Sequence, residues 1–519
     1  MRAHMQASTM LLRVGPINVH PVRARTSLLR NRRRPACLPV SARAATTLTP
    51  ATVVTPDSPT SSGNPMLGVL NNALLQQAEV QRQGLEEKPG EADARNFKLH
   101  WSVDFWKHRS QSQDLAGTNT NSSGTVNKAL EFIESLTSNA SKAGVFASPT
   151  ATAYWAYHLT RTGFLAVQGL SGLFATQAAA RAEGNPEAAE RSKVGQMFNT
   201  KSPLAPFVEP LTMYYQDYKN IEAGMYKLPW DMTTLRNKQY DPLHVLNTAA
   251  SFAYEASNTL RRRFQGAPEE VWLQSSMYPK YYLNTFHYQT DGWLSEKSAS
   301  IYEASTETLF LGRQDAMQRQ SLVPLHNFMQ GRGREGAGTK MLEVACGTGR
   351  FATFVKDNYP RMDYTALDLS PYYLYEARNN IKNWHRLRQP NLKMGGVDGS
   401  GTHFLQAAAE SIPQDDASHD VVLSIYLFHE LPPEVRRAAA KDMVRVLKPG
   451  GLLILTDSVQ LGDRSSFDAS IGRFGDFNEP YYRSFIAEDF GQMFKDCGLE
   501  CDEKLLGSST KVLSFRKPL

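Results

Sequence analysis

The feature that most constrains this chain is a tight glycine turn between a short apolar strand and a helix. The strand is predicted over 340–346, and Gly347-Thr348-Gly349-Arg350 leads directly into a helix predicted over 351–358. Glycine is required in such a turn because a side chain would block the close approach of a ligand to the backbone. The β-α-β-α pattern that follows predicts a parallel, doubly wound sheet.

A second strand, predicted over 363–368, ends in Asp368. This residue lies 19 positions after Gly349, a distance at which an acid can accept both hydroxyls of a ribose. Ser370 and Pro371 follow at once and are typical of a helix start. Because such sheets bind ligands at the carboxyl ends of their strands, these residues predict a nucleoside-binding site.

The third glycine of the GxGxxG pattern is replaced by Ala352. Some dinucleotide-binding folds accept alanine there, so the change only mildly disfavours a dinucleotide. It favours a single nucleoside with a short charged tail. A nicotinamide-dependent reductase on a similar sheet and a plain packing turn both remain open at this point.

The segment Glu343–Arg350 resembles motif I of class I S-adenosylmethionine-dependent methyltransferases. Further features follow in that family's order, with a fourth strand over 420–426, a Leu-Lys-Pro-Gly-Gly turn at 447–451 and a fifth strand over 452–457. The resemblance covers about residues 330–519 and is closest to the ubiquinone/menaquinone-type C-methyltransferase group. It implies an α/β, Rossmann-like, seven-stranded methyltransferase sheet, completed by strands over 501–506 and 510–515.

The resemblance also implies S-adenosylmethionine as the cofactor, with the glycine turn at its amino-acid tail and Asp368 at its ribose. Related enzymes carry an acid after strand three, where this chain has Ala408, so backbone near Ala409, or Glu410 itself, is expected at the adenine. The residues predicted to bind the cofactor are Glu343, Ala345, Cys346, Gly347, Thr348, Gly349, Asp368, Leu369, Ala409, Glu410 and Tyr426.

Methyl transfer depends mainly on alignment of donor and acceptor, and it needs a base only if the acceptor must lose a proton. Catalytic candidates are expected after strands four and five. His429 is our first choice for a general base because imidazole titrates near neutral pH; the alternative is that it only hydrogen-bonds a loop. Asp457 and Asp463 are predicted either to line the acceptor site or to satisfy a turn.

Other polar residues lie around this core. The segment 284–295, which includes Trp293, is rich in polar aromatics and forms either a lid over the cofactor or a packing surface. Glu479 follows strand five, where related enzymes have an acceptor wall. Glu303 and Glu307 share one helical face, which we interpret as solvated. No metal site is predicted, since the four cysteines lack a paired CxxC pattern.

The N-terminal region is typical of an organelle-targeting peptide followed by a linker. Residues 1–56 contain nine arginines and no lysine, aspartate or glutamate, and Val40–Ala44 resembles a plastid processing site. We predict a transit peptide over 1–43, a flexible linker over 44–95 and a mainly helical, aromatic-rich region over 96–329. The predicted location is the plastid (chloroplast), with the mitochondrion as the alternative. Without those arginines the net charge of +6 becomes −3, so no nucleic-acid partner is expected.

The apolar segment 151–175 contains His158 and Arg161, which predicts a buried helix rather than a membrane span and leaves peripheral membrane contact open. The sequence therefore predicts an organellar S-adenosylmethionine-dependent methyltransferase that acts on a small or lipophilic acceptor, such as a quinone or an isoprenoid-derived molecule. The alternatives are the reductase and a non-catalytic scaffold whose helical region docks a partner. Oligomeric state is left open.

Overall fold

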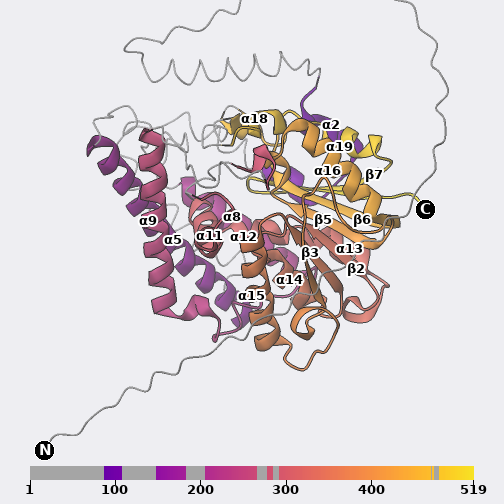
Figure 1. Ribbon diagram of the computed structural model, residues 1–519, viewed down its shortest axis with the longest axis horizontal. Coiled ribbons are helices and arrows are strands. Elements are labelled where there is room, and N and C mark those ends of the chain that lie inside the picture. Colours follow the sequence, from indigo (N-terminus) through magenta and orange to yellow (C-terminus); the bar gives the residue numbers. More distant parts are fainter. Residues whose placement is uncertain are drawn as a thin grey trace, which may run out of the picture. The chain divides into compact units, whose positions relative to one another are not determined.

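The computed structural model describes residues 87–107, 148–182, 205–265, 277–283, 291–468, 470–472 and 479–519. Within these residues the strands form one sheet of order β1-β7-β8-β6-β5-β2-β3-β4 (Figure 1). The strands are β1 (Lys98–Leu99), β2 (Lys340–Val344), β3 (Asp363–Asp368), β4 (Thr402–Gln406), β5 (His419–Ile425), β6 (Leu447–Ser458), β7 (Glu500–Gly507) and β8 (Thr510–Arg516).

Strand direction follows the predicted doubly wound pattern. Strands β2, β3, β4, β5 and β6 pair in parallel, whereas β8 is antiparallel to both β6 and β7. The predicted α/β, doubly wound sheet is thus confirmed, and the predicted strands match to within a few residues. The carboxyl ends of the parallel strands meet at one edge, which places the ends of β2, β3 and β5 together.

Both faces of the sheet are buried, because successive side chains of a strand point to opposite sides. In β6, Leu453 and Leu455 belong to one apolar cluster, and Leu452 and Ile454 belong to the other. Helices α16 (Pro433–Val446) and α19 (Phe490–Asp496) cover the first face, while α14 (Arg350–Asn358) and α15 (Pro371–Arg388) cover the second. Figure 1 shows the two pairs on opposite sides of the strands.

The region before the glycine turn is helical, as predicted, and it shares the core of the sheet. Tyr154 and Tyr214 belong to the same buried cluster as Leu453, and the side-chain amide of Gln216 donates to the carbonyl of Leu506 on β7 (2.9 Å). The helices are α5 (Pro149–Ala182), α8 (Ala205–Glu222), α9 (Pro242–Gln265), α11 (Glu296–Leu309), α12 (Gln314–Arg319) and α13 (Leu322–Met329). Of the helices described, none has the length and apolar content needed to cross a bilayer.

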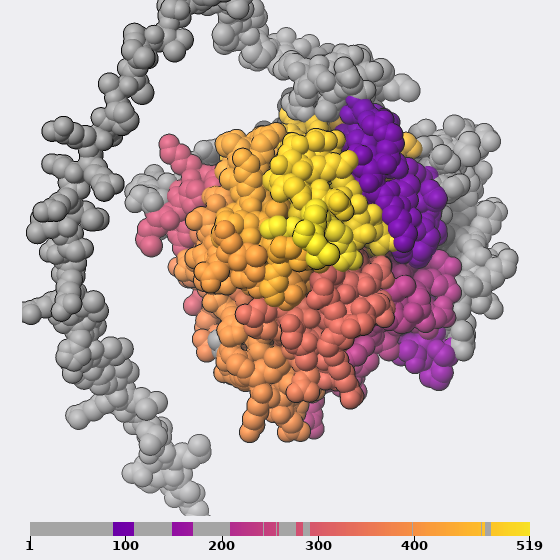
Figure 2. All heavy atoms as spheres, turned by 90° about the vertical axis from the view of Figure 1, so that its right-hand side faces the viewer, coloured from indigo at the N-terminus to yellow at the C-terminus, as the bar shows by residue number. Residues whose placement is uncertain are grey.

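The first described segment corrects two predictions. Residues 89–95 were assigned to the flexible linker, but they lie in helix α2 (Pro89–Asn96). The two-residue strand β1 then pairs with β7, so the sheet has eight strands rather than seven. Figure 2 shows this segment, in indigo, against the C-terminal residues. The predicted transit peptide and residues 284–290 lie outside the described residues.

The docking of α2 has a clear physical cause. The Asp93 carboxylate, which is 1% exposed, pairs with Lys504 (3.2 Å) and Lys511 (2.7 Å). Both lysines also pair with Asp463, at 2.5 and 3.3 Å. A Cβ at Gly90 would lie 2.3 Å from the backbone of Gly462. Sequence alone could not find this contact, because its partners are more than 350 residues apart.

Candidate active site

The glycine turn connects the carboxyl end of β2 to the start of α14. Gly347 (φ 55°) and Gly349 (φ 68°) both have the left-handed conformation, which glycine adopts at little cost. A Cβ at Gly349 would lie 2.9 Å from the Cβ of Ala377 on α15. Glycine at this position therefore lets α14 and α15 pack closely, and Gly347 is left to line a pocket.

Asp368, at the end of β3, lies directly beside this turn. Its Oδ2 accepts a hydrogen bond from the amide of Gly347 (2.8 Å), and its Oδ1 accepts one from the amide of Ser370 (2.8 Å). Burial raises the pKa of Asp368 to about 6, although those amides act in the opposite direction. The carboxylate also lines the pocket, and its unused lone pairs can accept hydroxyl groups of a ligand.

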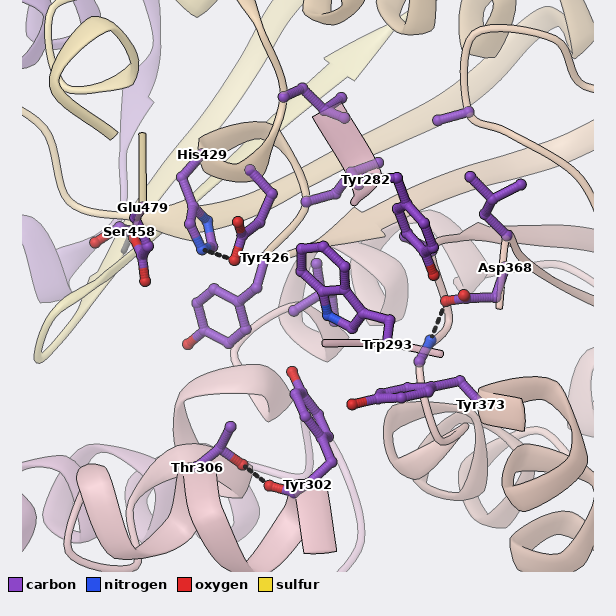
Figure 3. Close-up of a pocket in the computed structure, with 18 of the residues that line it drawn as sticks. Tyr282, Trp293, Tyr302, Thr306, Asp368, Tyr373, Tyr426, His429, Ser458 and Glu479 are labelled. Atoms are coloured by element: carbon purple, nitrogen blue, oxygen red, sulfur yellow. Dashed lines mark hydrogen bonds and ion pairs between the residues drawn. The ribbon is translucent and has the colours of Figure 1, made fainter. Parts of the chain in front are cut away.

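The pocket runs from Asp368 towards the carboxyl ends of β5 and β6, and its walls are mostly aromatic and aliphatic (Figure 3). The rings of Tyr282 and Trp293 stack, with their centroids 4.9 Å apart. Helix α11 supplies Tyr302 and Thr306. The helical region therefore builds one wall, and the strand ends of the methyltransferase sheet build the other. Further aromatic lining comes from Tyr281, Tyr373, Tyr426 and Tyr482.

His429 lies at the other end of the pocket, between carboxylates. Its Nδ1 is 2.6 Å from Oδ1 of Asp457, and its Nε2 is 3.5 Å from Oε1 of Glu430. Burial alone would lower the pKa of His429, but Asp457 and Glu430 outweigh it and hold the pKa well above the usual value. Because both ring nitrogens face a carboxylate, the imidazolium is the favoured form.

Glu479 completes this end of the pocket, where the sequence placed an acceptor wall. Burial raises the pKa of Glu479 to about 8, with His429 opposing the shift. Within the described residues, donor atoms of His429, Glu430 and Glu479 lie within 4.8 Å of one another. That spacing suits a small divalent cation, and it equally suits an imidazolium held by carboxylates. The prediction of no metal site remains untested.

The structure brings six of the predicted cofactor residues to the pocket wall and leaves five behind it. Those that line the pocket are Ala345, Gly347, Asp368, Leu369, Ala409 and Tyr426. Behind the wall, Glu343 accepts a hydrogen bond from the hydroxyl of Tyr364 (2.5 Å), and Glu410 accepts one from Tyr281 (2.6 Å). Cys346, Thr348 and Gly349 form the body of the turn.

The three predicted catalytic residues have different positions. His429 lines the pocket, and Asp457 lies behind it, where its Oδ2 accepts the amide of Phe428 (2.9 Å). Asp463 is 0% exposed and pairs with Lys504 and Lys511, away from the pocket. Asp463 therefore does not line the pocket, and the other predicted role holds: its Oδ2 accepts the amide of Gln460 (2.7 Å) and satisfies a turn, while both oxygens pair with the lysines that also bind Asp93 of α2.

Sequence reasoning missed part of the site and misassigned another part. Tyr302 and Thr306 line the pocket without having been singled out as site residues. Glu303 was assigned to a solvated face, but it contacts the glycine turn through Thr348 (3.0 Å). Glu307 is buried and pairs with Arg161 (3.4 Å). The available signal was the aromatic density before the turn, which indicates a buried surface.

Comparison with known proteins agrees with this geometry. A family model described as a methyltransferase domain matches residues 342–455. Phthiotriol/phenolphthiotriol dimycocerosates methyltransferase 1 of Mycobacterium ulcerans is 34% identical over 137 residues, which cover 26% of this chain and 44% of that protein. Malonyl-[acyl-carrier protein] O-methyltransferase of Paenibacillus is 29% identical over 144 residues, covering 27% and 47%. The chain thus spans less than half the length of these two relatives.

Among solved structures, a SAM-dependent methyltransferase from Aquifex aeolicus is 15% identical and covers 39% of this chain and 92% of that one, with a TM-score of 0.28. At this score the similarity adds nothing to what the family model shows. The matched residues 342–455 contain the glycine turn and Asp368 and extend into β6. This part of the chain therefore matches a methyltransferase domain, in agreement with the resemblance of its motifs to the class I S-adenosylmethionine-dependent methyltransferases.

Proposed function

We propose that this protein is an S-adenosylmethionine-dependent methyltransferase that acts on a lipophilic acceptor. The observation that carries the proposal is a single pocket with Asp368 and Gly347 at one end and the charged His429 at the other. The two ends suit two ligands held face to face, which is the arrangement that methyl transfer requires.

The geometry of Gly347 and Asp368 suits the binding of S-adenosylmethionine. The left-handed Gly347 has no other atom closer than 4.0 Å to the place of a side chain, so a ligand can approach its backbone. Asp368 presents a carboxylate at hydrogen-bonding reach of the same turn. When bound, S-adenosylmethionine supplies a methyl group on a sulfonium. The rings of Tyr302 and Trp293 line the pocket between its two ends and can stabilise a cation through their faces.

At the acceptor end, the residues can orient the acceptor and move a proton. As an imidazolium, His429 donates hydrogen bonds, so its surroundings favour orienting an acceptor oxygen over the base role that the sequence predicted. The carboxylate of Glu430 is then the group at this end that can accept the acceptor's proton, since burial keeps Glu479 largely protonated at neutral pH. The acceptor's nucleophilic atom gains the methyl group, and the bond from that methyl to sulfur breaks.

A lipophilic acceptor is supported by the aromatic and aliphatic lining and by the names of the mycobacterial relatives, which act on phthiotriol lipids. A quinone or isoprenoid-derived acceptor, and import into a plastid, remain predictions from the sequence. The arginine-rich leader supports import into an organelle. A fluorescent fusion of the leader, observed in cells that have both organelles, tests the plastid against the mitochondrion.

The direct test is calorimetry with S-adenosylhomocysteine and, separately, with NADPH. We expect micromolar or tighter binding of the first and none of the second, and binding of NADPH alone would establish the reductase instead. Metabolite profiling of a disruption strain should reveal a species lighter by one methyl group. If the cofactor binds but no such species appears, the non-catalytic scaffold becomes the better explanation.

A further inference from the structure

The helical region contacts the glycine turn through hydrogen bonds that the proposed mechanism does not use. Oε1 of Glu303, on α11, accepts a hydrogen bond from Oγ1 of Thr348 (3.0 Å) and another from Nδ2 of Asn380 (2.8 Å). Asn380, on α15, also donates to the backbone carbonyl of Thr348 (3.0 Å). One carboxylate from outside the family domain therefore fixes the middle residue of the turn, both directly and through its neighbour.

A second set of contacts holds the next residue of the turn. Arg350 donates from Nε and Nη2 to the two oxygens of Asp315 (3.1 and 2.6 Å), and it also pairs with Asp231. Two parallel bonds of this kind fix orientation as well as position. A positive charge at the start of α14 is unfavourable next to the helix N-terminus, and the two carboxylates compensate it. Both acids belong to the helical region.

These contacts matter because the turn they hold is intrinsically adaptable. Two glycines flank Thr348, and a glycine loses more conformational freedom on ordering than any other residue. The Gly347 amide must nevertheless stay within 2.8 Å of Asp368 to present the proposed cofactor site. A turn that is already fixed binds its ligand without paying that ordering cost.

We propose that Glu303 is a positioning residue for the cofactor: it preorganises the glycine turn through Thr348 and thereby sets the affinity for S-adenosylmethionine. This inference rests on the proposed function, since the ligand is the proposed cofactor. The N-terminal helical region is accordingly part of the cofactor site, and α11 contacts both the glycine turn and the pocket. The same helix that holds the turn with Glu303 lines the pocket with Tyr302 and Thr306.

The test is a set of calorimetric titrations of the full chain with S-adenosylhomocysteine. Glu303→Ala and Thr348→Val should each weaken binding by about tenfold, the scale of one lost hydrogen bond to a charged group. Thr348→Ser keeps the hydroxyl and should bind like the unaltered protein. Glu296→Ala, on an exposed residue of the same helix, is the matched control and should leave affinity unchanged.

The double variant Glu303→Ala/Thr348→Val separates positioning from general damage to the fold. Thr348→Val keeps the backbone carbonyl that Asn380 binds, so if Glu303 acts through Thr348, the double variant should bind no more weakly than Glu303→Ala alone. Losses that add, or an unchanged affinity in Glu303→Ala, would overturn the proposal. If Glu303→Ala does not fold in a thermal melt, the comparison of Thr348→Val with Thr348→Ser decides: equal affinities overturn the proposal. Failure of the unaltered protein to bind S-adenosylhomocysteine would instead refute the proposed function.

Discussion

Cofactor binding should depend on pH through Asp368, because its carboxylate is the group placed to accept the ribose hydroxyls. The pKa of Asp368 is raised to about 6 by burial. The carboxylate is the form that accepts hydrogen bonds from both hydroxyls, so affinity should be full above this pKa and fall below it. Between pH 7 and pH 5 the ionised fraction drops from about nine tenths to about one tenth, which predicts about tenfold weaker binding.

The assay is calorimetry with S-adenosylhomocysteine at pH 5, 6 and 7, with a thermal melt at each pH to show that the protein is folded. The ligand's α-carboxyl and α-amino groups titrate outside this range, so the protein's own group dominates. Asp368→Asn cannot ionise and should bind weakly at every pH, without the slope. A dissociation constant that stays constant from pH 5 to pH 7, or the same slope in Asp368→Asn, would refute the reasoning.

Three further variants test the remaining assignments. Asp463→Asn leaves a buried lysine pair undercompensated, which costs about 3–5 kcal/mol; the melting temperature should fall by several degrees while the affinity for S-adenosylhomocysteine, measured by calorimetry, is kept. Gly349→Ala forces a Cβ to 2.9 Å from Ala377, so both the melting temperature and the affinity should drop, and an unchanged melt would contradict the packing argument. His429→Ala should lower turnover by roughly a hundredfold with cofactor affinity kept; unchanged turnover in a methyl-transfer assay would remove His429 from the reaction.

The cofactor end could be predicted from sequence because its signals are local. A strand, two glycines and an acid at a fixed spacing determine where Gly347 and Asp368 lie, once the strands pair in parallel. No long-range contact has to be known. The predicted helix start at Ser370 is confirmed for the same reason, since its hydroxyl accepts the amide of Tyr373 three residues later (3.2 Å).

The different roles of Asp457 and Asp463 could not be predicted from local sequence. Both acids lie at or just after the end of the same strand and are six residues apart, so the sequence offers no reason to treat them differently. Their roles are decided by their partners. Asp457 meets His429, whereas Asp463 meets Lys504 and Lys511 from the two final strands. The buried Asp93, which lies about 370 residues earlier in the chain, also pairs with Lys504 and Lys511.

Glu303 was misassigned for a related reason. Two acids four residues apart on a helix are typical of a solvated face, and the aromatic residues around them indicate a buried surface without showing which side of the helix is buried. Glu307 has its charge compensated by Arg161 on α5, and Glu303 faces Thr348 and Asn380. Such pairs become visible only when helices that are distant in sequence are packed against the sheet.

The position of the acceptor residues along the chain bears on what the protein methylates. The family model ends at residue 455, so Trp293 and Tyr302 precede the shared part and Glu479 follows it. The glycine turn, Asp368, His429 and Glu430 thus lie inside the matched residues, while Trp293, Tyr302 and Glu479 lie outside them. The acceptor end combines one imidazolium with the carboxylates of Asp457, Glu430 and Glu479. Even with Glu479 protonated, a negatively charged acceptor would face excess negative charge in a buried site, so we expect the acceptor to be uncharged at the reacting end.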